Sequence, residues 1–73
     1  MAVIIFKGWK KGMRGISFIH LLREKTDISL KNAKDIKERI VYGEVITLPV
    51  ADLSTAQEII ATAINLGVIC ELE

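Results

Sequence analysis

The segment from Ser29 to Ile40 constrains the fold more than any other part of the chain. Apolar residues recur in it every three or four positions, which places them on one face of a helix; they are Leu30, Ala33, Ile36 and Ile40. Ser29 is suited to cap this helix, because its hydroxyl can accept a hydrogen bond from a free backbone N–H group. Lysines follow the edge of the apolar face, at Lys31, Lys34 and Lys37. The segment therefore predicts an amphipathic helix with a basic edge.

Composition supports one compact domain spanning residues 1–73. Hydrophobic residues make up 51% of the 73 residues, enough for a core despite the small size. Ten Lys and Arg face nine Asp and Glu, so the chain lacks the basic excess of proteins that depend on phosphate neutralisation, although a local basic patch remains possible. The single cysteine excludes an internal disulfide, and the apolar run Val3–Phe6 is too short for a signal peptide or a membrane span. We expect a cytoplasmic protein.

Three segments rich in β-branched residues predict strands, at Met1–Lys7, Glu44–Val50 and Val68–Glu73. Pro49 removes a backbone donor, so the second strand is expected to be short or to lie at a sheet edge. In the last strand, Val68, Cys70 and Leu72 are predicted to face the core.

Helical periodicity appears in three other segments, beginning at Ile16, Leu30 and Ser54. Ser54 to Gln57 has the pattern of a capping box, and glycines at Gly43 and Gly67 are expected to end the second and third helices. The first helix, up to Lys25, is more apolar than one buried face requires, so it is either covered on two sides or partly exposed for a partner.

The predicted order is β-α-α-β-α-β. This order is typical of an α+β two-layer sandwich, in which three helices cover one face of a small, mainly antiparallel three-stranded sheet.

Several segments carry a resemblance to a known family: Ala2–Lys7, Ile19–Ile36 with its string Leu30-Lys31-Asn32-Ala33-Lys34-Asp35, and Ala56–Glu73. In these the chain resembles the C-terminal domain of the bacterial ribosomal stalk protein, large-subunit protein L seven/L twelve. The resemblance implies a non-enzymatic domain that recruits translational GTPases through its first two helices. The positions that match the family's binding residues are Ile16, Ile19, His20, Arg23 and Lys34, and Lys31 adds a further cation from the basic edge.

The chain also departs from the stalk family. His20 stands where that family usually has lysine, and the turn that is usually rich in glycine reads Asp27-Ile28-Ser29. No N-terminal dimerisation domain or Ala-rich hinge precedes the similar region, so we expect a stand-alone domain and not the stalk itself.

The ClpS protease adaptors share the stalk domain's fold, and a ClpS-like adaptor is an alternative. Their acidic Asn-Asp-Asp loop after the first strand is absent, and its place is taken by the basic run Lys7 to Gly12. Because an amine-binding site needs carboxylates or carbonyls directed at a cation, a basic loop argues against adaptor function.

A second alternative is RNA binding through the glycine-punctuated loop after the first strand. Its candidate residues are Lys7, Trp9, Lys10, Lys11 and Arg14, four cations with one aromatic ring for stacking. The simpler interpretation is a solvated flexible loop. The glycines do not follow the phosphate-loop order GxxxxGK[ST], which argues against nucleotide binding. A third alternative is a homo-oligomer formed through surplus apolar helix surface or an edge strand.

Catalysis, metal binding and cofactor binding are not expected. His20 is the only histidine and has no second histidine, serine or cysteine in register, so we interpret it as a helix-surface residue. Cys70 is interpreted as a small buried hydrophobe, and it lies too far from His20 in sequence to form a recognised metal-ligand spacing.

Overall fold

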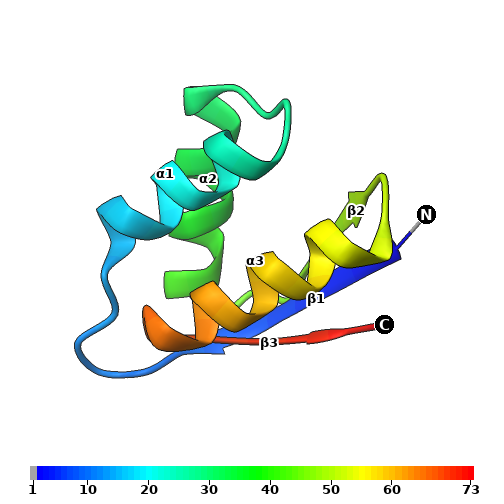
Figure 1. Cartoon of the computed structure of the whole chain (residues 1–73). Helices are drawn as coiled ribbons and strands as arrows, with labels where there is room; N and C mark the ends of the chain where they lie inside the picture. The colour runs from blue at the N-terminus through cyan, green and yellow to red at the C-terminus, as the bar shows by residue number, and fades with distance from the viewer. Residues whose placement is uncertain (1) are drawn as a thin grey trace.

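A computed structural model of the chain describes residues 2–73, and their elements follow the predicted order (Figure 1). The elements are β1 (Ala2–Trp9), α1 (Gly15–Lys25), α2 (Leu30–Val41), β2 (Ile46–Val50), α3 (Leu53–Asn65) and β3 (Val68–Leu72). The predicted fold class is confirmed: three helices lie on one side of a three-stranded antiparallel sheet. Met1, with which the first predicted strand begins, lies outside the described residues.

β1 is the central strand of the sheet, and its neighbours β2 and β3 both run antiparallel to it. Ile4 pairs with Leu48 on one side and with Leu72 on the other. Because side chains alternate along a strand, Ile4 and Phe6 are buried under the helices, whereas Val3 and Ile5 face the open side of the sheet. Pro49 lies in an edge strand, as the sequence predicts.

β1 continues to Trp9, beyond its predicted end at Lys7, because a β-bulge accommodates Gly8. Phe6 pairs with Cys70 and Gly8 pairs with Ile69, which leaves Lys7 as one extra residue in β1. A bulge shifts the alternation of side chains by one position. Lys7 lies on the open side of the sheet, as Val3 and Ile5 do, but Trp9, beyond the bulge, is directed to the side that carries the helices.

The helices are not equally close to the sheet. α2 and α3 pack directly on the strands, whereas α1 packs on α2 and α3 and, within residues 2–73, makes no close backbone approach to a strand. Phe18 of α1 still reaches the sheet: its ring centroid lies 5.4 Å from that of Phe6, at an interplanar angle of 78°. α1 is covered from two sides, which accounts for its apolar character, and it leaves Ile16 exposed.

The ends of α2 agree with the sequence. Ser29 Oγ accepts a hydrogen bond from Asn32 N at 3.2 Å, which confirms Ser29 as the N-cap. At the other end Gly43 has a φ of +91°, and the backbone N–H of Glu44 donates to Arg39 O. Such a left-handed residue just after the last turn is a common way to satisfy the free carbonyls of a helix.

The beginning of α3 differs from the prediction. The N-cap is Asp52 and not Ser54, so the proposed capping box is wrong. Asp52 Oδ1 accepts from Thr55 N at 2.7 Å, and its Oδ2 accepts from Thr55 Oγ1 at 3.1 Å. A carboxylate two residues earlier offers two acceptor atoms and lies at the positive end of the helix dipole.

We expect Asp52→Ala to lower the melting temperature by several degrees and Ser54→Ala to leave it within error, because only Asp52 caps α3. The hydrogen bonds from Thr55, first from its backbone N–H, hold the pKa of Asp52 below its ordinary value of 3.8. The stabilisation is therefore present above pH 3.8 and lost as pH falls through the lower, folded-state pKa. Thermal melts of wild type and Asp52→Asn at pH values above and below 3.8 test the pH dependence, and melts of the two alanine variants test the cap. Equal decreases of the melting temperature in Asp52→Ala and Ser54→Ala would contradict the assignment of the cap.

Candidate functional site

One candidate surface lies on the hairpin of α1 and α2. Ile16, His20 and Arg23 are spaced by four and three positions, so they share the solvent-facing stripe of α1. All three are exposed, and Ile16 keeps 76% of its surface accessible. A large aliphatic side chain this exposed at the end of a helix is available to a partner.

The second apolar residue expected on this surface is not available. Ile19 is only 8% exposed and belongs to the core, so its prediction as an exposed anchor is wrong. Helical periodicity alone does not show which apolar residues a neighbouring helix will cover, and here α2 and α3 both pack on α1. Leu30 shows the reverse: it was assigned to the buried stripe but is 42% exposed, because it lies in the first turn of α2.

The lysines of α2 divide into two groups. Lys31 and Lys34 are exposed and line a shallow depression of about 410 Å³ together with Asn32, Asp35 and Glu38. Lys37 is half-buried, since its Cε lies 2.6 Å from where a Cβ on Gly15 would be. Lys34 lies one turn before Lys37, on the same side of α2. We call the exposed set Ile16, His20, Arg23, Leu30, Lys31 and Lys34 the hairpin surface.

The loop between β1 and α1 forms a second candidate surface, and backbone hydrogen bonds tie it to the turn between α3 and β3. Lys10 N donates to Gly67 O at 2.7 Å, and Arg14 N donates to Leu66 O at 2.9 Å. Within the loop, Met13 N donates to Lys10 O at 3.1 Å. Figure 1 shows the loop passing beside this turn, so it is held in one shape at three points.

The structure does not bring all the predicted loop residues together. Trp9 Nε1 donates to Val41 O at 3.1 Å, which fixes the indole at the C-terminal end of α2. Lys7 instead lies on the open side of the sheet, where its Nζ pairs with Glu71 Oε1 at 2.6 Å. Lys7 therefore does not share a surface with Lys10, Lys11 and Arg14.

Sequence reasoning missed Tyr42, which follows Val41 and is 83% exposed. The only signal in the sequence is its position directly before Gly43, outside the apolar stripe of the preceding helix. Since Trp9 bonds to the carbonyl of Val41, the indole and the Tyr42 side chain belong to the same end of the molecule.

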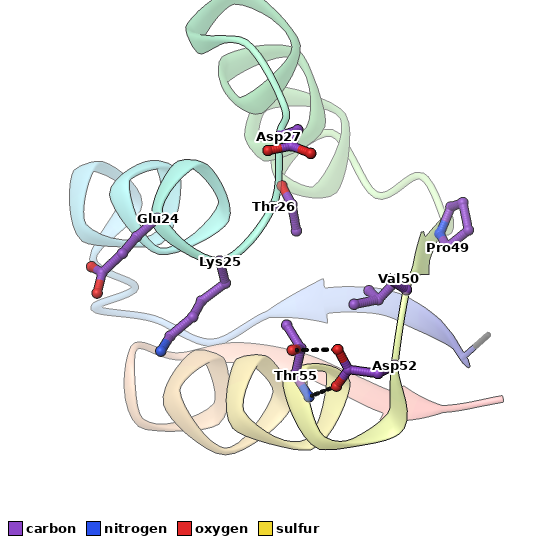
Figure 2. A pocket seen from close by; sticks show the side chains of 9 residues that line it. Glu24, Lys25, Thr26, Asp27, Pro49, Val50, Asp52 and Thr55 are labelled. Atoms are coloured by element: carbon purple, nitrogen blue, oxygen red, sulfur yellow. Dashed lines mark hydrogen bonds between the residues drawn. The ribbon is translucent and has the colours of Figure 1, made fainter.

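A cleft of about 340 Å³ separates the end of α1 from the turn between β2 and α3 (Figure 2). Most of its polar groups already have partners: Asp52 accepts from Thr55, Lys25 pairs with Glu58 at 3.2 Å, and Thr26 Oγ1 donates to Leu22 O at 2.6 Å. Glu24 points away from the cleft in Figure 2. The cleft is therefore a junction between secondary-structure elements, and most of its polar groups form bonds within the protein.

His20 is an exposed helix-surface residue, as interpreted, and no group of three or more His, Cys, Asp or Glu side chains in residues 2–73 could hold a metal ion. Burial raises the pKa of Cys70 from 9.0 to about 11, which keeps the thiol protonated and unreactive near neutral pH. Leu72, predicted to be buried beside it, is exposed because it lies at the end of β3.

No helix in the described part of the chain combines the length and hydropathy needed to cross a membrane. Comparisons of the chain with protein-family models, curated proteins and solved structures give no match. A function therefore has to be argued from the two candidate surfaces themselves.

Substitution of Gly67 and Gly43 can test how closely the loop after β1 approaches the turn after α3. Both glycines follow a helix and both have a φ above +90°. A Cβ at Gly43 would meet nothing within 4 Å, whereas a Cβ at Gly67 would lie 2.9 Å from Met13 Cα. We expect Gly43→Ala to cost about 1 kcal/mol from backbone strain. Gly67→Ala should cost about 1–3 kcal/mol more, because the loop backbone must move. Urea unfolding measures both, and equal costs would contradict the close approach of the loop.

Proposed function

We propose that the chain is a small non-enzymatic module for protein–protein recognition, and that it binds an acidic partner through the hairpin surface. The observation that carries this proposal is the exposure of Ile16 at the start of α1, in one stripe with His20 and Arg23. Apolar anchors flanked by cations suit a partner that offers an apolar pocket with an acidic rim.

Burial of Ile16 in a partner would supply most of the affinity. Covering an aliphatic side chain of this size contributes about 1.5–3 kcal/mol, and Leu30 adds a smaller apolar contact from α2. The cations contribute mainly to orientation and association rate. Arg23, Lys31 and Lys34 form no ion pair with another side chain in residues 2–73, so they are free to pair with a partner.

The resemblance to the stalk C-terminal domain suggests the class of partner. In that family the corresponding surface recruits translational GTPases, and the positions that match are Ile16, His20, Arg23 and Lys34, with Ile19 now part of the core. A translational GTPase is therefore the partner we propose to test first.

The test compares binding of a purified translational GTPase from the same cell to wild type and to Ile16→Asp. Because Ile16 supports no core contact, we expect this variant to stay folded and to bind at least tenfold more weakly. Lys34→Glu should weaken binding less and slow association, an effect that should diminish at high salt.

Ile64→Asp is the matched control, since Ile64 is also an exposed isoleucine but lies on α3. It should bind as wild type does. Circular dichroism checks the folding of each variant, and light scattering checks for self-association. Equal binding by Ile16→Asp and Ile64→Asp, with both folded, would overturn the proposal.

A further inference from the structure

We propose that the end of the molecule bearing Trp9 and Tyr42 binds single-stranded nucleic acid. In this site the two aromatic rings stack on unpaired bases, and Lys10, Lys11 and Arg14 contact the phosphates. We call these five residues the aromatic–basic end. The site shares no residue with the hairpin surface and does not depend on the proposed protein partner.

The two rings are placed by the fold. The bulge at Lys7 turns Trp9 to the helical side of the sheet, where its indole N–H donates to Val41 O and 43% of the residue stays exposed. Tyr42 follows Val41 directly, and its backbone N–H donates to Glu38 O at 3.0 Å, so its Cα is fixed while its ring is solvated. Exposed aromatic rings on a fixed backbone are suited to stacking with unpaired bases.

The cations are held in the same way. Lys10 and Arg14 are attached through their backbone N–H groups to Gly67 and Leu66, so the loop does not have to be ordered on binding. Within residues 2–73, none of Lys10, Lys11 and Arg14 forms an ion pair. Their charges are therefore not neutralised by neighbouring side chains.

The local charge is positive although the whole chain carries a net charge of only +1. Lys37 adds a fourth cation, since it lies against Gly15 at the start of α1. The carboxylates nearest in sequence are Glu38, which follows Lys37 and whose carbonyl accepts from Tyr42 N, and Glu44, whose backbone N–H donates to Arg39 O. Lys10, Lys11 and Arg14, none of which forms an ion pair in residues 2–73, are the charges that would attract phosphate.

Single strands fit this end better than duplexes do. In a duplex the faces of the bases are stacked on one another, so exposed Trp and Tyr rings have no base face to contact. An unpaired strand offers base faces for the rings as well as phosphates for the cations. Both RNA and DNA have these features, so the experiment includes both.

Trp9 is the only tryptophan in the chain, so its fluorescence reports directly on the site. The probes are oligouridylate and oligothymidylate of about ten nucleotides, with a duplex of the same length for comparison. We expect saturable quenching by both single strands, with a dissociation constant of about 10⁻⁴–10⁻⁶ M, and weaker binding of the duplex. With three phosphate contacts, affinity should fall about 20-fold between about 50 and about 200 mM salt.

Variants assign the effect to residues, with anisotropy of a labelled oligonucleotide as the readout. Tyr42→Ala should weaken binding about fivefold or more, and Lys10→Glu with Lys11→Glu should reduce the salt dependence as well. The matched control carries the same charge change on the hairpin surface, Lys31→Glu with Lys34→Glu, and should bind the oligonucleotide much more nearly as wild type does.

The inference would be overturned if neither single strand gave salt-dependent quenching of Trp9. It would also be overturned if the Lys10/Lys11 and Lys31/Lys34 double variants lost equal affinity for the oligonucleotide. The result is independent of the protein-recognition proposal, because Tyr42→Ala leaves Ile16 and its neighbours untouched. Oligonucleotide binding without binding of the GTPase would support the aromatic–basic end alone, and the opposite result would support the hairpin surface alone.

Discussion

The edge-to-face contact between Phe6 and Phe18 connects the central strand to the outermost helix. α1 rests on α2 and α3, and its Phe18 reaches the sheet by contacting Phe6. Both rings are fully buried, and an aromatic pair of this geometry contributes about 0.5–1.5 kcal/mol beyond the area it buries. The rotation of α1 that buries Phe18 also leaves Ile16, His20 and Arg23 facing solvent and places Ile19 in the core.

The β-bulge in β1 has an equally local cause and a wider effect. The one extra residue at Lys7 leaves that lysine on the open side of the sheet, with Val3 and Ile5, and directs Trp9 to the helical side. From there the indole bonds to the end of α2, and the following loop bonds to the turn after α3. Segments far apart in the sequence are thereby collected at one end of the molecule, with aromatic rings and unpaired cations exposed.

The sequence was sufficient to predict the order of the elements, the cap at Ser29 and the glycine that ends α2, because each of these depends on residues close together in the chain. The burial of Ile19 and the exposure of Leu30 depend on which helices pack together. Helical periodicity predicts the apolar face of a helix but not the element that covers it. The bulge that separates Lys7 from Trp9 depends on strand register, which no local pattern in β1 reveals. Nothing in the sequence groups Tyr42 with Trp9, because only the fold brings Trp9 to the end of α2.

The central claim is that this small fold presents two separate recognition surfaces. The most direct measurement is chemical-shift mapping by nuclear magnetic resonance, with a ¹⁵N-labelled chain titrated first with a single-stranded oligonucleotide and then with the protein partner. We predict that the oligonucleotide shifts the indole signal of Trp9 and the amides of Lys10 to Arg14 and Tyr42, and that the protein partner shifts those of Ile16, His20 and Arg23. Shifts from both ligands on one shared set of residues, or none in these sets, would contradict the account.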